Sequence, residues 1–339
     1  MTDSRRRYNA GVQRSKGLLE LAAELYDSSL SFETTRGAQG ALQIDSRLGS
    51  TIHLSLTGSR SRRSNGVDLS IAVGGFQELK AVAQKKLSLL WINPSIAVMM
   101  ACKGKGPFAK PLPLRTIAVF PSHDVVGFAV HQSTGITSLG QIKQERIPLR
   151  LSTGRTIKSP FLQDTTMFSV GEVIKAAKFS LADIRKWGGK IQTARRPSHP
   201  DRRAAIKDGQ INAVFDEGIL SWGQAAVDHG FRFLPVEGAI RARMVAMGYR
   251  PVVMSKDRLP GIPEEVETLD FSGWPMVVHA DMADDVAYAL CEAIEARKDA
   301  IRIIINRWNY PSFALIMKKR LVMSPSTRGH SGSTAKGDI

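Results

Sequence analysis

Three short apolar segments of this chain each pass through a small or polar turn and run directly into a helical pattern. In the clearest case the apolar segment is Val67–Val73, and the glycines Gly74 and Gly75 separate it from a helical pattern over Phe76–Lys86. A second apolar segment, Leu87–Ile92, follows. Because only about a dozen residues separate the two apolar segments, they are predicted to be parallel strands joined by a helix.

The same order of apolar segment, turn and helix recurs at residues 149–154 and at residues 211–218. In open parallel sheets, ligands bind beyond the carboxyl ends of the strands, where helix N-termini offer unpaired N–H groups. The pattern therefore predicts an α/β protein whose binding residues follow its strands.

The length of 339 residues exceeds what one ordinary core supports and predicts two domains. No stretch reaches the ~18 apolar residues of a membrane span, so the chain is not expected to cross a membrane. Residues 1–16 and 311–339 are predicted to be disordered, and residues 17–26 have the spacing of an amphipathic helix. The basic start lacks the apolar segment of a signal peptide, which by itself indicates the cytoplasm.

The net charge of +16 is unusual, and it is compatible with a nucleic-acid partner or an anionic surface. However, the basic residues fall in scattered clusters, and aromatic residues do not alternate with them as base stacking requires. No helix-turn-helix or zinc-finger spacing is present. We therefore expect no specific nucleic-acid binding and interpret the charge as a basic surface that attracts anions.

Cofactor and metal motifs are absent from the sequence. The two cysteines and the seven dispersed histidines do not have the spacing of a metal site. The turn at Gly74-Gly75 lacks the third glycine of a dinucleotide fingerprint and the Gly-Lys-Ser/Thr of a phosphate-binding loop. We expect neither a cofactor nor a metal.

The loop that follows the strand at residues 149–151 carries hydroxyl groups, a glycine and a guanidinium. Arg155 can bind a carboxylate through two hydrogen bonds, while Ser152 and Thr153 can satisfy its remaining lone pairs. The alternative is a solvated basic loop.

A second set of candidates follows the two strands of the first unit of the pattern. Gly75 permits close approach of a ligand to the backbone, and Gln77 offers a hydrogen-bonding side chain. Asn93 and Ser95 follow the next strand and can line the same crevice, whereas Trp91 is better interpreted as core.

The acidic residues at a strand end and a Ser-His-Asp run are also candidate catalytic groups, and neither pattern requires catalysis. Asp216 and Glu217 are adjacent at a strand end, so their side chains point to opposite faces, and capping of the next helix is a sufficient role for Asp216. Ser122, His123 and Asp124 contain the residue types of a catalytic triad, but neighbours in sequence cannot form the relay.

Nine sequence strings, in this order along roughly residues 50–300, resemble the TAXI-type solute receptors of TRAP transporters, within the NMT1-like, type II periplasmic-binding-protein group. They are Leu56–Gly58, Val67–Gln77, Trp91–Ser95, Gly106–Phe108, Pro121–Asp124, Thr134–Leu139, Trp187–Gly189, Phe215–Ile219 and Phe271–Pro275.

The resemblance implies a two-lobe fold in which each lobe is a mostly parallel sheet flanked by helices, with the ligand cleft between the lobes. Lobe 1 would comprise residues 17–130 and 240–310, and lobe 2 residues 131–239, with crossings near 128–132 and 235–245. It also implies a periplasmic, non-enzymatic receptor that captures a small organic anion, a carboxylate or an amino acid, for TRAP transporter membrane subunits.

Carried over by position, the resemblance assigns ligand-binding residues to both lobes. The first lobe would contribute Gly75, Phe76, Gln77, Asn93 and Ser95; the second would contribute Ser152, Arg155 and Asp216. The family has a small residue where this chain has Phe76.

Two other hypotheses stay open. A cytoplasmic enzyme or sensor on the same fold would act on an anionic metabolite, with Asp216, Glu217 and His123 as its acid–base candidates. A polyanion binder would depend on the net charge and would lose affinity as salt rises.

Overall fold

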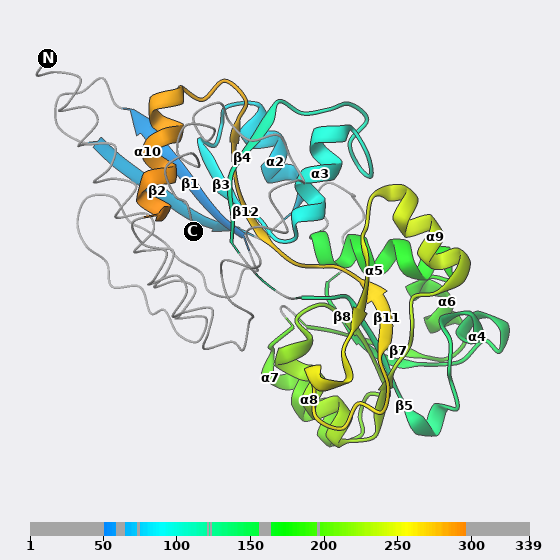
Figure 1. Cartoon of the computed structure of the whole chain (residues 1–339). Helices are drawn as coiled ribbons and strands as arrows, with labels where there is room; N and C mark the ends of the chain where they lie inside the picture. The colour runs from blue at the N-terminus through cyan, green and yellow to red at the C-terminus, as the bar shows by residue number, and fades with distance from the viewer. Residues whose placement is uncertain are drawn as a thin grey trace, which may run out of the picture. The chain divides into compact units, whose positions relative to one another are not determined.

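The computed structural model describes residues 51–58, 65–72, 75–120, 122, 124–155, 164–194 and 197–295. The predicted helix at residues 17–26 and the predicted disorder at residues 1–16 and 311–339 lie outside these ranges. The chain divides into two compact units, unit 1 (residues 1–122 and 273–339) and unit 2 (residues 123–272). Each unit is an α/β structure built on a five-stranded sheet (Figure 1), which confirms the predicted fold class.

The sheet of unit 1 has the strand order β2-β1-β3-β12-β4. Its strands are β1 (Thr51–Gly58), β2 (Asn65–Ala72), β3 (Leu89–Trp91), β4 (Leu114–Phe120) and β12 (Trp274–His279). Its helices are α2 (Phe76–Ala83), α3 (Ser95–Lys103) and α10 (Asp284–Glu295).

Every described strand pair of unit 1 is antiparallel, in contrast to the mostly parallel sheet that was expected. Strands β2 and β3 do run in the same direction, as predicted, because each is antiparallel to β1, but β1 lies between them. The loop of six residues between β1 and β2 is too short for a parallel crossover. Strand β12, drawn in orange in Figure 1, separates β3 from β4 in the same way.

Strand β3 is the middle strand of the unit 1 sheet, and both this strand and most of helix α3 are buried. All three residues of β3 are buried, as is typical of a strand covered on both faces. Residues 95–101 of α3 are all buried as well, so this helix is covered all round rather than along one stripe. Helix α2 instead buries Phe76, Leu79 and Val82, which share one face at a spacing of three.

Unit 2 contains a mixed sheet with the order β7-β6-β8-β5-β9. Strand β6 is parallel to β7 and β8, and β5 is antiparallel to β8 and β9. The strands are β5 (Gly127–His131), β6 (Arg150–Thr153), β7 (Lys190–Thr193), β8 (Ala213–Asp216) and β9 (Phe231–Phe233), and a separate pair consists of β10 (Pro251–Met254) and β11 (Val266–Leu269).

The sequence pattern predicts helices at residues 165–179, 181–187, 202–208 and 219–229, and the structure has a helix at each of these places. The helices of unit 2 are α4 (Leu139–Gln144), α5 (Thr165–Ala176), α6 (Leu181–Lys186), α7 (Pro200–Lys207), α8 (Ile219–Asp228) and α9 (Gly238–Met247). The sequence predicted extended structure for residues 244–254, whereas residues 244–247 complete α9 and only β10 is extended.

The segment from residue 240 to residue 272 belongs to unit 2, although the sequence placed it in the first lobe. Hydrogen bonds from the Val236 N–H to the Glu267 carbonyl oxygen (2.8 Å) and from the Val126 N–H to the Leu269 carbonyl oxygen (3.2 Å) fasten β11 to this unit. The chain therefore passes between the units at residues 122–123 and 272–273 rather than near 128–132 and 235–245.

Candidate functional site

The carboxyl ends of β6 and β8 bring two of the predicted residue groups together in unit 2. The two strands are parallel neighbours, with Thr153 opposite Phe215, so the residues that follow them emerge at the same edge of the sheet. Ser152 lies next to that end of β6, and Asp216 is the last residue of β8. Both side chains are buried.

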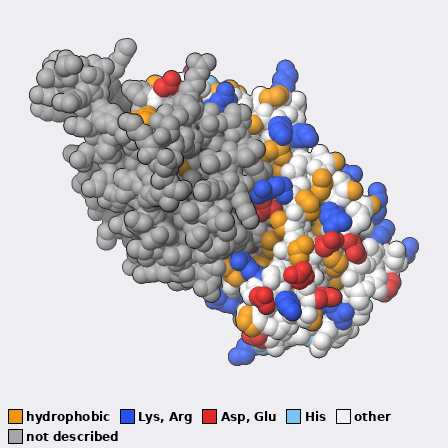
Figure 2. All heavy atoms as spheres, in the orientation of Figure 1, with side chains coloured by type: hydrophobic (Ala, Val, Ile, Leu, Met, Phe, Trp, Pro, Cys, Tyr) orange, Lys and Arg blue, Asp and Glu red, His pale blue; other side chains and the backbone are white. Residues whose placement is uncertain are grey.

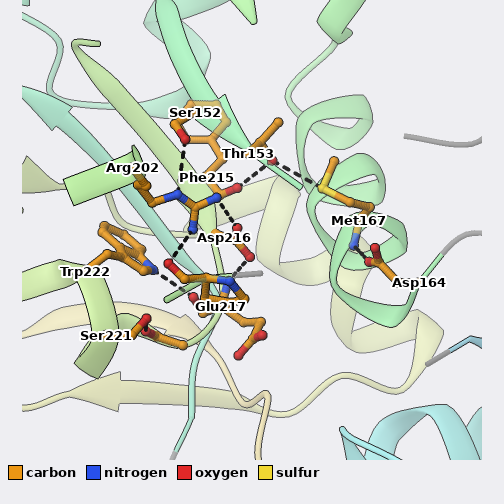
Figure 3. Close-up of polar contacts among 12 residues, drawn as sticks. Ser152, Thr153, Asp164, Met167, Arg202, Phe215, Asp216, Glu217, Ser221 and Trp222 are labelled. Carbon is orange, nitrogen blue, oxygen red and sulfur yellow. Dashed lines mark hydrogen bonds and ion pairs between the residues drawn. The ribbon is translucent and has the colours of Figure 1, made fainter. Parts of the chain in front are cut away.

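Arg202, a fully buried residue of α7, connects Ser152 to Asp216 (Figure 3). Its Nε donates to Ser152 Oγ (3.1 Å), its Nη2 forms an ion pair with Asp216 Oδ2, and its Nη1 donates to the Pro197 carbonyl oxygen (3.3 Å). A buried guanidinium requires such partners because an unpaired buried charge is very costly. The Ser152 hydroxyl and one Asp216 carboxylate oxygen are therefore occupied by contacts with Arg202.

The predicted capping role of Asp216 is wrong. Helix α8 has Gly218 as its N-cap, in the left-handed conformation, with no side-chain cap among the described residues. The second oxygen of Asp216 accepts instead from the Glu217 N–H (2.8 Å).

Arg202 was not among the predicted site residues, because it is one of the scattered basic residues that were interpreted as surface charge. A usable signal was the helical spacing of α7. Arg202, Ala205 and Ile206 lie on one face and are buried, whereas Asp201 and Arg203 are exposed.

Three further carboxyl groups surround Asp216. Burial raises the pKa of Glu217 well above its usual value, and the nearby charges of Asp124, Asp216 and Asp164 raise it further. Burial also raises the pKa of Asp124, although its oxygens accept from the N–H groups of Val125 (2.8 Å) and Gly218 (2.9 Å). The hydrogen bond between the Glu217 and Asp124 side chains raises the pKa of Glu217 further and opposes the rise in the pKa of Asp124, the directions expected when the Glu217 carboxyl group is the donor.

Asp164 caps the next helix at this edge, and the sequence did not identify it as a candidate. Its Oδ1 accepts from the Met167 N–H at the start of α5 (2.6 Å). Burial, and then the charge of Asp216, raise the pKa of Asp164 to about 7. Thr153 fixes the same region, because its hydroxyl donates to the Phe215 carbonyl oxygen (2.6 Å) and contacts Met167 Sδ (3.2 Å).

Arg155 lies two residues beyond the end of β6, with an exposed side chain. Gly154 precedes it, and a side chain at this glycine would meet Met167, since an added Cβ would lie 2.8 Å from Met167 Sδ. The loop can therefore pass close to α5 and present Arg155 at the surface.

In unit 1, the residues that begin α2 have different environments. Gly75 is the N-cap, and its N–H donates to Glu78 Oε2 (2.9 Å). Burial raises the pKa of this glutamate to about 7. The ring of Phe76 is buried and packs edge-on against Phe108 at a centroid distance of 5.6 Å, whereas Gln77 is exposed.

The start of α3 contains the other predicted residues of unit 1. Asn93 is buried, and its Nδ2 donates to the Gly273 carbonyl oxygen (3.2 Å). Pro94 is the N-cap, and no described side chain caps this helix. The hydroxyl of Ser95 is also buried and has no hydrogen-bond partner among the described residues. Trp91 is buried, as expected of a core residue.

On the face of the molecule drawn in Figure 2, the Lys and Arg side chains of the described residues are interspersed with Asp and Glu and do not form one basic stripe. In the part of the chain that the structure describes, no group of three or more His, Cys, Asp or Glu side chains is arranged to hold a metal ion. Within those same ranges no helix has the length and apolar character needed to cross a membrane.

Comparison with known proteins gives likenesses in structure only. No protein-family model and no curated protein matches the chain. XAC2383 from Xanthomonas citri, bound to chloride ion, matches with a TM-score of 0.39 at 10% identity, over 79% of this chain and 85% of that chain. PhnD1 from Prochlorococcus marinus, in complex with methylphosphonate, matches with a TM-score of 0.36 at 10% identity, over the same shares of the two chains.

A third solved structure, a TctC solute binding protein from Polaromonas, matches with a TM-score of 0.35 at 12% identity, over 66% of this chain and 68% of that chain. At TM-scores below 0.5 these likenesses are too weak to support a conclusion about this chain. The α/β class therefore rests on the sheets and helices described above.

Proposed function

We propose that this chain is a non-enzymatic solute-binding receptor that captures a small organic anion, a carboxylate or an amino acid. On this proposal it acts in the periplasm and delivers its ligand to the membrane subunits of a TRAP-type transporter. The resemblance to TAXI-type solute receptors supports the transporter type and the compartment. The described residues supply the argument for an anion.

The start of α3 is the observation that carries the proposal. The first N–H groups of a helix and its dipole favour a negative charge, and no described side chain caps α3. The Ser95 hydroxyl lies in the first turn of the same helix and is buried without a partner among the described residues. A carboxylate accepts hydrogen bonds from both kinds of donor, which makes it a suitable ligand.

Arg155 is the corresponding candidate in unit 2. Its exposed guanidinium follows a strand end and has the planar donor geometry that matches a carboxylate. Ser152 and Asp216, in contrast, hold Arg202 and support the edge of the sheet from within. We therefore assign ligand contact to Arg155 and a positioning role to Ser152 and Asp216.

The test is calorimetric titration of the full chain with small carboxylates and amino acids, using wild type, Ser95→Ala and Arg155→Ala. Losing the Ser95 hydroxyl removes one hydrogen bond to the ligand and weakens binding by ~0.5–1.5 kcal/mol. The melting temperature without ligand stays the same or rises, because an unsatisfied buried group has been removed. Arg155→Ala weakens binding by ~1.5–3 kcal/mol.

Ser133→Ala is the matched control, since Ser133 is exposed and hydrogen-bonds to His131. It leaves the affinity unchanged. The proposal is wrong if none of these ligands binds, or if Ser95→Ala and Arg155→Ala both bind as tightly as wild type.

A second candidate function, an enzyme acting on an anionic metabolite, is favoured by Glu217 alone. A carboxyl group whose pKa is raised well above its usual value is suited to general acid catalysis. Asp216 is occupied by Arg202, and His123 lies outside the described residues. Recovery of the bound molecule after incubation, followed by NMR, separates the two functions. A receptor returns it unchanged, and an enzyme converts it.

A further inference from the structure

A groove in unit 2 lies at the opposite end of β6 from the candidate site. It opens where β6 and β7 begin and has a volume of about 500 Å³, within the range of small-molecule sites. Its lining residues are Arg150, Lys190, Ile191, Gln192, Gln210 and Ile211. Arg150 is the first residue of β6, whereas Ser152 and Arg155 lie at or beyond its other end.

Two cations stand side by side in this groove. Arg150 and Lys190 are directly paired in the parallel ladder between β6 and β7. Like charges at neighbouring positions of a sheet repel, and a bound anion would offset the repulsion. The residues that line the groove include no carboxylate to do so.

The guanidinium of Arg150 is already held in place. Its Nε donates to the Gln210 carbonyl oxygen (3.0 Å), and its Nη2 donates to the Gly209 carbonyl oxygen (3.2 Å), just beyond the end of α7. The backbone N–H of Arg150 donates to Asn212 Oδ1 (2.7 Å). Such a fixed cation loses little side-chain freedom when a ligand binds.

Gln192 also lines the groove, and its amide oxygen is unsatisfied. It lies two residues beyond Lys190 on β7 and therefore projects to the same face of the sheet. Its Oε1 is buried and finds no hydrogen-bond donor in the described ranges of the chain. A buried acceptor without a donor is costly, so a ligand that donates a hydrogen bond here is stabilised.

We propose that this groove is a second anion site, which takes inorganic phosphate. Phosphate accepts from Lys190 and Arg150, and at neutral pH inorganic phosphate keeps a P–O–H group that donates to Gln192 Oε1. A carboxylate at the same pH has no such donor. The site is separate from the proposed receptor site and does not depend on it.

The experiment is titration of the full chain with inorganic phosphate in low salt, followed by calorimetry. We expect saturable binding that Lys190→Ala weakens roughly three- to tenfold, as loss of one partly solvated charge contact implies. Lys186→Ala is the matched control, because Lys186 is an exposed lysine at the end of α6 and does not line the groove. Its affinity for phosphate remains that of wild type.

Gln192→Leu is the second variant, and it also tests folding. It weakens phosphate binding while the melting temperature without phosphate stays the same or rises, because the unsatisfied amide oxygen is gone. Arg150 is left intact, since its bonds hold the residues after α7. Arg155→Ala leaves phosphate affinity unchanged.

The proposal is overturned if phosphate shows no saturable binding, or if Lys186→Ala weakens it as much as Lys190→Ala. It is also overturned if only Arg155→Ala removes binding, which would place phosphate at the proposed receptor site. Failure of the receptor proposal gives a different result, because no variant then binds a carboxylate or an amino acid.

Discussion

Replacing Asp164 by asparagine is predicted to stabilise the protein at pH 8 and to leave it unchanged near pH 4. Asparagine is as good an N-cap as aspartate, so its side-chain oxygen still accepts from the Met167 N–H at the start of α5. The substitution therefore removes the ionisation of Asp164 and little else.

The sign of the effect follows from the direction of the pKa shift. The pKa of Asp164 is about 7 in the folded protein, against an ordinary value of 3.8. Between these values the folded state binds more protons than the unfolded state, so the free energy of unfolding falls as pH rises from about 4 to about 7. Above about pH 7 Asp164 is charged in both states, so the folded protein bears the full cost of burying that charge.

The size of the effect follows from the same two values. A shift of one pKa unit corresponds to ~1.4 kcal/mol, so a shift of about three units corresponds to ~4 kcal/mol at most. Because Asp164 is only half-buried as a whole residue, solvent screening reduces this to ~2–4 kcal/mol. The Asp164→Asn variant should show this gain over wild type at pH 8.

The assay is urea denaturation of wild type and Asp164→Asn at pH 4, 6 and 8. Asp183→Asn is the control, because it changes the net charge equally while the Ser180 hydrogen bond lowers the pKa of Asp183. This control loses stability at pH 8 rather than gaining it. If Asp164→Asn gave the same dependence on pH as wild type, the assignment of a buried charge to Asp164 would be refuted.

Two further substitutions test how unit 2 is held together. Arg202→Met leaves Asp216 buried without its partner and should cost ~3–5 kcal/mol in urea unfolding at pH 8, partly recovered in the double variant with Asp216→Asn. Arg203→Met, at the exposed neighbouring position, should change stability by less than ~0.5 kcal/mol, and equal effects of the two changes would argue against a buried ion pair. Gly127→Ala places a Cβ 2.8 Å from Ile219 Cγ2 and should destabilise by ~1–3 kcal/mol, whereas Gly171→Ala in α5 meets no atom within 4 Å and should stabilise by ~0.4–1 kcal/mol. A Gly127→Ala variant as stable as wild type would show that Ile219 of α8 does not approach Gly127 of β5 this closely.

The sequence predicted most of the elements of unit 2, because caps and glycines mark their ends locally. Ser180 caps α6 through a capping box with Asp183, and Gly209 follows α7 in the left-handed conformation. Helix α9 was not predicted because its pattern is weak. Only Met244 is buried among its residues, so no apolar stripe marks it as a helix.

Strand directions in unit 1 could not be predicted from local pattern. The helix between β2 and β3 shows that these strands run the same way, but it does not show which strands separate them. Strand β12 reaches the sheet from a point more than 150 residues beyond β4 in the chain. Such pairing depends on contacts between distant segments, about which a turn or a cap carries no information.

The positions of the strand ends directed attention to the candidate residues but could not show which of their side chains are hydrogen-bonded within the protein. Ser152 and Asp216 bind Arg202 at the edge of the sheet, so under the proposed function substitutions there change ligand affinity through the position of the loop. The Ser95 hydroxyl has no hydrogen-bond partner among the described residues, so under the proposed function its removal changes affinity without loss of stability. A residue that contacts ligand and one that positions the site are therefore distinguished by measuring stability and affinity on the same variant.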